Sequence, residues 1–244
     1  MVDRLFAEPR LAALYDLFCH PRQDFDFYLP LVMSADTVLD VGCGTGELLR
    51  GAREAGHSGR LCGLDPAGAM LDQARARQDV EWVLGDLTSV DWAEQFDLVV
   101  MTGHAFQVLV NDEELRASLA TIGELLTEDG RFVFETRNPL ARAWEAWTPD
   151  SPVARIAPDG DHVTMTHDVV SPYDGKTVSF TSTFASPDWE RPHVSRSTLR
   201  FLDAAEVSKF LADAGMTIEE QLGDWDRQPI TDTSPEIITA ARRA

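Results

Sequence analysis

The sequence has little cysteine, and its cysteines form no pattern. Cys19, Cys43 and Cys62 are the three thiols in 244 residues, and no Cys-x-x-Cys motif occurs. An odd number of scattered thiols argues against a disulfide framework and against a cysteine zinc site. The six histidines are scattered as well, so no metal-ligand cluster is visible. We therefore expect no bound metal and a reducing, cytoplasmic location.

Positive charge is also scarce. The chain has 21 Lys and Arg residues against 41 Asp and Glu residues, a formal net charge of -20 at pH 7. Contacts with a phosphate backbone require clustered basic side chains. We expect neither nucleic acid nor an anionic membrane surface as a partner. The charge indicates a solvated acidic surface, with a halophilic or cation-binding surface as the alternative.

Long apolar runs are missing too. No stretch approaches the roughly 20 apolar residues that cross a bilayer. The N-terminal residues 1–10 carry acids and a proline instead of the apolar centre of a secretory signal. Hydrophobic residues still make up 44% of the chain, which is sufficient for a globular core. The length fits one α/β domain with a modest insertion, or two small domains.

Short apolar runs alternate with helical periodicity as far as residue 140. Strands that alternate with helices at this spacing predict a parallel sheet with helices on both faces. Asn111 or Asp112 is expected to cap the longest helix, and residues 128–130 to form the turn after it. A helical lead-in precedes the first strand. The expected strands are 37–41, 60–64, 80–84, 96–101 and 131–135, and the expected helices are 47–55, 67–77 and 112–126.

The pattern changes after Pro139. Three stretches alternate with a period of two, at 162–170, 177–186 and 193–201, and they predict an inserted antiparallel sheet of three strands. In the middle strand, Val178, Phe180 and Phe184 share one face. We expect the opposite, polar face to meet solvent or a polar ligand.

A helix and two strands are expected at the C-terminal end. Asp203 and Glu206 form a capping box for a helix that ends near Gly215. The last strands, at 216–222 and 237–241, return to the main sheet. The expected division is therefore a lead-in or lid at 1–36, a core at 37–140, an inserted sheet at 141–202 and a C-terminal part at 203–244.

The strongest motif lies at the end of the first strand, where residues 38–46 read Val-Leu-Asp-Val-Gly-Cys-Gly-Thr-Gly. Glycines let the backbone turn and approach a ligand closely, and the following helix start presents free N–H groups. Dinucleotide enzymes use the spacing Gly-x-Gly-x-x-Gly at such a place. Here the glycines stand at 42, 44 and 46, and Asp40 precedes them. An acid beside the loop disfavours a pyrophosphate and favours a cation.

Two further aspartates follow the next two strands. Asp65 stands about 20 residues beyond the glycine loop, where an acid typically binds ribose hydroxyls. It could also cap the helix that begins near Pro66. Asp86 could accept a hydrogen bond from an adenine amino group, or serve only as a turn residue.

Together these motifs resemble the motif series of the class I S-adenosylmethionine (SAM)-dependent methyltransferases. The resemblance covers roughly residues 36–140 and includes Met70 after the second strand, the segment 96–100 and the segment 126–134. It implies a Rossmann-like sheet of seven strands, mostly parallel, whose last strand runs antiparallel. It also implies SAM as the cofactor and S-adenosylhomocysteine as the product.

The same resemblance implies where the cofactor lies. The methionine moiety is expected near Asp40, Gly42, Cys43, Gly44, Thr45 and Gly46, the ribose at Asp65, and the adenine at Asp86 and Leu87. The other expected cofactor contacts are Tyr15, Pro66, Met70 and Thr102.

In layout the chain is similar to the amino-sugar N-methyltransferases and to glycine N-methyltransferase-like enzymes. In such enzymes the lead-in and the inserted sheet cover the acceptor pocket. The resemblance therefore implies methyl transfer to nitrogen or oxygen of a small molecule, and a homodimer is compatible with it.

The acceptor is expected beyond the fourth and fifth strands. His104 could take a proton from the acceptor, or merely line the pocket. Arg137 and Asn138 are expected to bind the acceptor, with a salt bridge inside the fold as the alternative for Arg137. Two other functions stay open: a SAM-binding protein without catalysis, and an NAD(P)-dependent oxidoreductase, which the glycine spacing and Asp40 disfavour.

Overall fold

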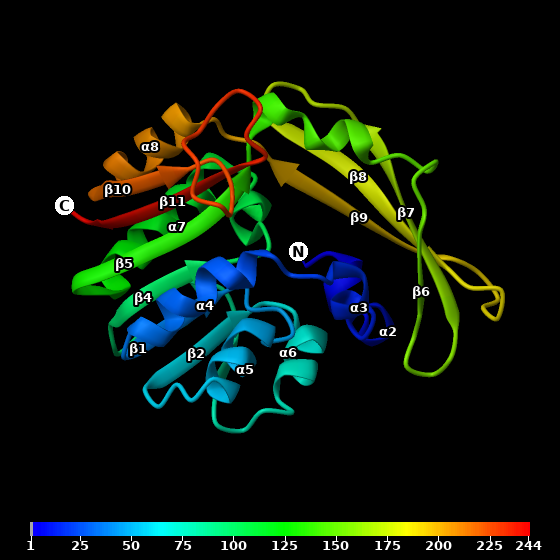
Figure 1. The fold of residues 1–244 in the computed structure, drawn as a ribbon, viewed down its shortest axis with the longest axis horizontal. Coiled ribbons are helices and arrows are strands. Elements are labelled where there is room, and N and C mark those ends of the chain that lie inside the picture. Colours follow the sequence, from blue (N-terminus) through cyan, green and yellow to red (C-terminus); the bar gives the residue numbers. More distant parts are fainter. Residues whose placement is uncertain (1) are drawn as a thin grey trace.

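The protein is built on a seven-stranded sheet in the order β10-β11-β5-β4-β1-β2-β3 (Figure 1). The computed structural model describes residues 2–244. The last strand, β11, runs antiparallel to both of its neighbours, and β1 to β5 run parallel, as expected. The strands are β1 Thr37–Val41, β2 Arg60–Asp65, β3 Glu81–Leu84, β4 Phe96–Met101, β5 Leu126–Arg137, β10 Met216–Leu222 and β11 Glu236–Arg243.

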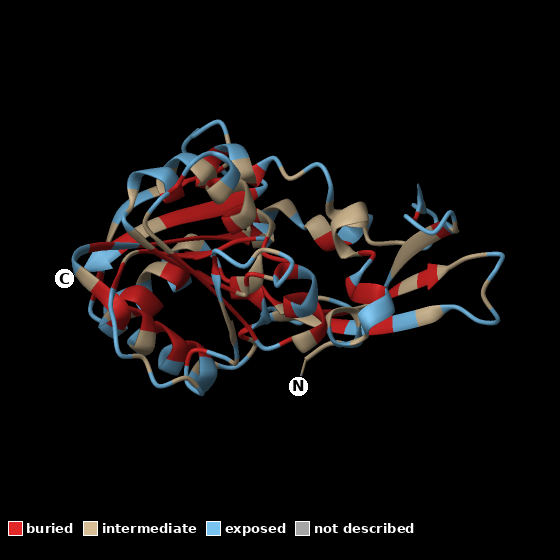
Figure 2. Cartoon of the chain, turned by 90° about the horizontal axis from the view of Figure 1, so that it is seen from below, coloured by how far each residue is buried: buried red, intermediate tan, exposed pale blue. Residues whose placement is uncertain are grey.

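Helices cover both faces of this sheet. Val38 and Val100 pack towards α4 and α5, whereas Leu39 and Val99 pack towards α7 and α8. The strands are apolar on both faces for this reason, and Figure 2 shows the buried residues concentrated in them. The helices are α1 Arg4–Ala7, α2 Pro9–Ala12, α3 Tyr15–Cys19, α4 Asp24–Ser34, α5 Glu47–Glu54, α6 Gly68–Ala74, α7 Asp112–Leu125 and α8 Ala204–Asp213.

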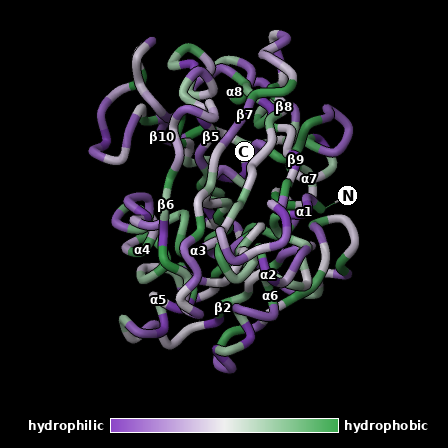
Figure 3. Tube along the Cα trace, turned by 90° about the vertical axis from the view of Figure 1, so that its right-hand side faces the viewer, coloured by the Kyte–Doolittle hydropathy of each residue, from purple (hydrophilic) through white to green (hydrophobic). Residues whose placement is uncertain are grey.

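A second sheet contains four strands, so the prediction of three was wrong. Its order is β6-β7-β8-β9, from β6 Val153–Ile156, β7 His162–Ser171, β8 Thr177–Ala185 and β9 His193–Arg200. The missed strand, β6, is a short edge strand with three of its four residues exposed, so it lacks an apolar alternation. Figure 3 shows this side of the molecule, where hydrophilic and hydrophobic segments alternate along the chain.

The short helices at the start of the lead-in, labelled α2 and α3 in Figure 1, lie between the two sheets, whereas α4 packs on the main sheet. Leu11 and Leu14 pack against Val163 and Phe184 of the second sheet. This apolar cluster connects the lead-in to the insertion, although the two segments are far apart in sequence. Within residues 2–244, no helix has the length and apolar character needed to cross a membrane.

Two helix caps are confirmed, and one turn is corrected. Asn111 accepts a hydrogen bond from Glu114 N–H at the start of α7, and Asp203 and Glu206 form the capping box of α8. The expected turn at 128–130 instead lies within β5, as an irregularity where the pairing shifts. The segment after Pro139 forms two short 3-10 helices, η2 Pro139–Ala141 and η3 Ala143–Ala146.

Candidate functional site

The glycine loop between β1 and α5 has backbone conformations that require glycine. Gly42, Gly44 and Gly46 have φ values of +74°, +57° and +74°. Gly42 and Gly44 line cavities, whereas Gly46 is covered by Trp82, whose ring lies 2.3 Å from the position of an added Cβ. Gly46 is therefore a packing residue, because it lines none of the cavities described below.

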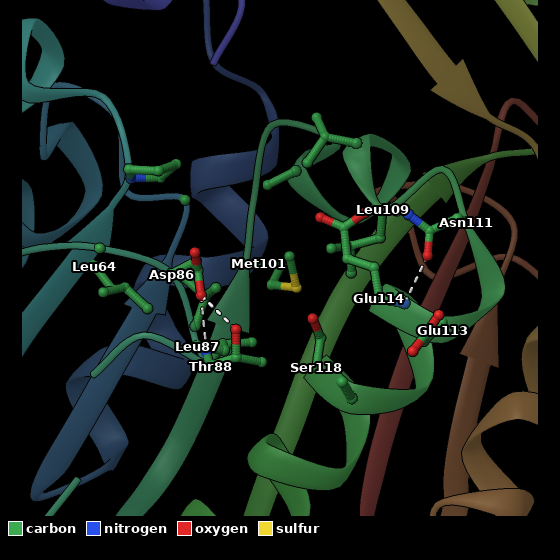
Figure 4. Close-up of a pocket in the computed structure, with 17 residues that line it drawn as sticks. Leu64, Asp86, Leu87, Thr88, Met101, Leu109, Asn111, Glu113, Glu114 and Ser118 are labelled. Atoms are coloured by element: carbon green, nitrogen blue, oxygen red, sulfur yellow. Dashed lines mark hydrogen bonds between the residues drawn. The ribbon is translucent and has the colours of Figure 1, made fainter. Parts of the chain in front are cut away.

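A cavity of about 410 Å³ lies beyond the ends of β1 to β4 (Figure 4). Its floor is apolar, with Leu64, Leu87 and Met101. Asp86 stands on one side and faces the start of α7 across the opening. One Asp86 oxygen accepts hydrogen bonds from Thr88 and Ser89, and these bonds lower the pKa of Asp86. The other oxygen has no partner within residues 2–244, so it can accept from a ring amino group over the apolar floor.

Asp65 bonds to the backbone on both sides of its position in the fold. Its Oδ1 accepts from Ala67 N–H just before α6, and its Oδ2 accepts from Gly44 N–H, both at 2.8 Å. Burial raises the pKa of Asp65, and these two bonds oppose the shift. The residue fixes the glycine loop and also lines a second cavity together with Pro66 and Met70. Each carboxylate oxygen keeps a lone pair for a ribose hydroxyl.

Asp40 is buried, with an orphaned oxygen. It is 1% exposed, and its Oδ1 has no hydrogen-bond partner among the described residues. Burial raises the pKa of Asp40 to about 7, while Arg22 opposes the shift. A small cavity of about 20 Å³ lies here, lined also by Gly44, Thr45 and Thr102. An unpaired buried carboxylate oxygen is costly unless a ligand donates to it, and an ammonium group fits that need.

Arg22 lines the same small cavity, although no sequence motif indicated it. Its guanidinium pairs with Asp24 at 2.5 Å and approaches Thr102 Oγ1 at 3.4 Å. It comes from the lead-in, so only the folded chain brings it next to the end of β4. A cation there complements Asp40, so the two side chains together could bind a ligand that carries both a carboxylate and an ammonium group.

Three other residues expected at the cofactor hold the same region together. Thr45 Oγ1 donates to Asp16 at 2.6 Å and so ties the glycine loop to α3. Tyr15 lines three neighbouring cavities, and burial raises its pKa. Cys43 is buried and its pKa is raised well above the usual value, chiefly by desolvation. Its thiol is therefore unreactive, and its backbone N–H bonds to Leu64.

The second cavity, of about 290 Å³, lies between the two sheets. The lead-in contributes Phe6 and Tyr15, and the second sheet contributes Phe180 and Ser182. Phe180 and Ser182 belong to the same face of β8 as Val178 and Phe184, so this face, and not the opposite polar one, lines the cavity. The remaining wall consists of Thr102, Trp147, His167, Ser197 and Leu199 among others.

His104 lies where this cavity meets a third one of about 340 Å³. Its backbone is left-handed, with φ of +63°, and its N–H donates to Glu135 Oε1 at 2.7 Å. The other oxygen of Glu135 accepts from the hydroxyl of Tyr28, and burial raises the pKa of Glu135. The ring Nε2 of His104 lies 3.0 and 3.1 Å from the two carboxylate oxygens of Glu236.

Arg137 lines both of these cavities. It donates to Gln107 Oε1 at 2.9 Å and lies 5.4 Å from the centre of the Trp147 ring. Desolvation lowers the pKa of Arg137. Within residues 2–244 its guanidinium forms no ion pair, so the salt bridge weighed from the sequence does not form. A largely desolvated guanidinium without a carboxylate can bind an anionic group.

Asn138 does not share this position. It is 2% exposed, its amide donates to the carbonyls of Thr231 and Ser234, and its carbonyl accepts from Leu140 N–H. These bonds occupy the side chain in holding the loop between β10 and β11. The structure therefore gives Asn138 a structural role and not the acceptor contact expected from the sequence.

Residues 38–130 match the family described as a methyltransferase domain. The 2-phytyl-1,4-naphtoquinone methyltransferase of Thermosynechococcus vestitus is 38% identical over 115 residues, 45% of this chain and 50% of the relative. The chain spans about half the length of the curated relatives it matches.

Solved structures match nearly the whole chain. The CcbJ methyltransferase from Streptomyces caelestis matches with a TM-score of 0.79 and 20% identity over 96% of both chains. SAM-bound CalS10, an amino pentose methyltransferase from Micromonospora echinaspora, matches with a TM-score of 0.70 and 22% identity, over 95% of this chain and 97% of that one. At such identities the likeness shows the fold, which here includes the lead-in and the second sheet.

Proposed function

We propose that the protein is a SAM-dependent methyltransferase acting on nitrogen or oxygen of a small molecule, since residues 38–130 match a methyltransferase domain and the fold matches that of solved methyltransferases. The observation that carries the proposal is the buried, unpaired oxygen of Asp40 beside the glycine loop. An ammonium group satisfies this oxygen, whereas a pyrophosphate would be repelled by it.

Three neighbouring cavities could hold the methionine moiety, the ribose and the adenine of SAM. Asp40 and Arg22 would hold the ammonium and carboxylate of the methionine moiety at the smallest cavity. Asp65 would bind the ribose hydroxyls, and Asp86 the adenine amino group above Leu87. Gly42 lines all three of these cavities, so the ligand would pass closely over the backbone there.

The acceptor would occupy the cavity between the two sheets. SAM supplies an electrophilic methyl group, so the protein mainly aligns the acceptor and excludes water. Trp147 and Phe180 would contact the body of the acceptor, and Arg137 would bind an anionic group on it. His104 would take the proton that the acceptor loses. The second sheet thus supplies part of the site.

Calorimetry with SAM, S-adenosylhomocysteine and NAD tests the cofactor. We expect both sulfur compounds to bind and NAD not to bind. Binding of NAD alone would instead support an oxidoreductase. A SAM-binding protein without catalysis would bind SAM but release no S-adenosylhomocysteine with any acceptor.

A further inference from the structure

We propose that Glu236 is the positioning residue of His104, and that the pair removes a proton from the acceptor. This proposal rests on the proposed function, because the proton belongs to the group that is methylated. Glu236 begins β11, and His104 follows β4, so 132 residues separate them along the chain. Both carboxylate oxygens lie within 3.1 Å of the same ring nitrogen, Nε2.

Glu236 contacts His104 and not the arginine that lies opposite it in the sheet. In the sheet, Glu236 stands directly opposite Arg137 of β5. A cross-strand pair of opposite charges would normally be favourable, yet within the described chain Arg137 has no ion pair and Glu236 contacts His104. The arrangement leaves a guanidinium available to the acceptor and commits the carboxylate to the imidazole.

The backbone around His104 supports the same conclusion. A positive φ is uncommon for a residue with a side chain and persists only where neighbours hold it. Glu135 holds it here, because it accepts the His104 N–H, and the Tyr28 hydroxyl in turn holds Glu135. One buried carboxylate thus fixes the main chain of His104, and the other fixes its ring.

A carboxylate on Nε2 determines which ring nitrogen carries the proton. Glu236 accepts a hydrogen bond, so the neutral imidazole keeps its hydrogen on Nε2. Nδ1 then has a lone pair, has no hydrogen-bond partner within residues 2–244, and is not fully buried. His104 lines both cavities at this point. Nδ1 is the atom of the ring that can accept a proton.

The step balances without a further reactant. An ammonium or hydroxyl acceptor gives its proton to Nδ1, and Glu236 stabilises the resulting imidazolium. The acceptor lone pair forms the new bond to the methyl carbon, while the carbon–sulfur bond breaks and its electron pair stays on sulfur. The proposed step applies to an amine or an alcohol, whose N–H or O–H proton is the one that Nδ1 takes.

Nitrogen NMR of protein labelled with ¹⁵N-histidine tests the pair without any acceptor. His104→Gln identifies the signals of His104 among those of the six histidines. In the wild type at a pH where the ring is neutral, we expect a protonated Nε2 and an unprotonated Nδ1. Glu236→Gln should convert this single tautomer into a mixture. The matched control is Glu135→Gln, which changes the buried carboxylate that contacts the backbone of His104, and it should preserve the tautomer.

Three results would overturn the proposal: a wild-type ring with its hydrogen on Nδ1, an unchanged tautomer in Glu236→Gln, or an equal change in both variants. The wild-type spectrum decides the first of these even if a variant fails to fold.

Turnover is measured with methyl-labelled SAM and a panel of small amines and alcohols. Glu236→Gln should lower kcat at least tenfold and leave KM for SAM unchanged. If calorimetry shows that SAM does not bind the wild type, the proposed function is rejected, whereas the tautomer result still holds.

Discussion

At the scale of single residues, the raised pKa of Asp40 predicts that ligand binding depends on pH. Its pKa is raised from 3.8 to about 7 by burial. The folded protein without ligand therefore holds this proton more tightly than the unfolded chain does. The contribution to stability is present below pH 3.8 and is lost as the pH rises through about 7. An ammonium ligand needs the ionised carboxylate, so binding should oppose this loss.

We predict that SAM affinity rises with pH through about 7 and that Asp40→Asn removes this rise. At a pH above that value, the variant should bind SAM more weakly by about 1.5–3 kcal/mol, the range for a lost hydrogen bond to a charged group. Calorimetry across this pH range measures both effects. Asp86→Asn is the control: its pKa is lowered, so binding weakens but the rise with pH remains. A rise that persists in Asp40→Asn would remove Asp40 from the ammonium site.

Some residues of the candidate site could be predicted from the sequence, and others could not, for a physical reason. Asp40, Asp65 and Asp86 follow parallel strands, whose carboxyl ends meet at one edge, so their juxtaposition could be predicted. Arg22 comes from the lead-in, and Glu236 comes from the antiparallel strand β11. Their partners depend on tertiary packing, which no local pattern encodes.

At the scale of elements, strand β8 presents its two faces to different surroundings. Phe180 lines the cavity between the sheets, and its neighbour Thr181 points to the other face. We predict that Phe180→Ala lowers methyl transfer at least about tenfold, equivalent to 1.4 kcal/mol, because the acceptor loses an aromatic wall. Thr181→Ala is the matched control and should leave transfer unchanged. Labelled SAM with an accepted amine or alcohol gives the rates, and calorimetry should give equal SAM affinities. Equal rates for the two variants would mean that the second sheet is only a stabilising flap.

Helix α8 allows a prediction about stability alone. Asp203 caps it in a reciprocal arrangement with Glu206. Asp203→Ala should lower the free energy of unfolding by about 1 kcal/mol, measured by urea denaturation, without changing SAM affinity. If SAM affinity fell as well, α8 would be coupled to the site.

The elements themselves were predictable to different degrees. Both caps and the strands β4 and β10 lie where the sequence placed them. The strand β6 and the start of β5 were missed, because an exposed edge strand and an irregular pairing carry no apolar periodicity.

At the scale of the whole molecule, the charge of -20 governs which partners can approach. We predict no salt-dependent binding of double-stranded DNA or structured RNA, because contacts with phosphates depend on clustered basic side chains. A gel-shift assay at physiological ionic strength measures this. Retarded bands that weaken with added salt would contradict the prediction.

The fold class followed from the sequence, since the alternation of strands and helices implies a parallel sheet and the family resemblance implies its antiparallel last strand. The packing of the lead-in against the second sheet did not follow, because it depends on the contacts of Leu11 and Leu14 with Val163 and Phe184. Those contacts hold together the lead-in and the second sheet, which both line the cavity between the sheets.

Transfer of a labelled methyl group tests the central claim most directly. The protein is incubated with methyl-labelled SAM and the panel of small amines and alcohols, and labelled product and S-adenosylhomocysteine are quantified. The account predicts labelled product and S-adenosylhomocysteine in equal amounts, and only in the presence of an accepted amine or alcohol. It also predicts that Asp40→Asn strongly lowers the amount of both products. The account would be contradicted if SAM bound but no methyl group were transferred to any amine or alcohol. It would also be contradicted if the label appeared only on carbon.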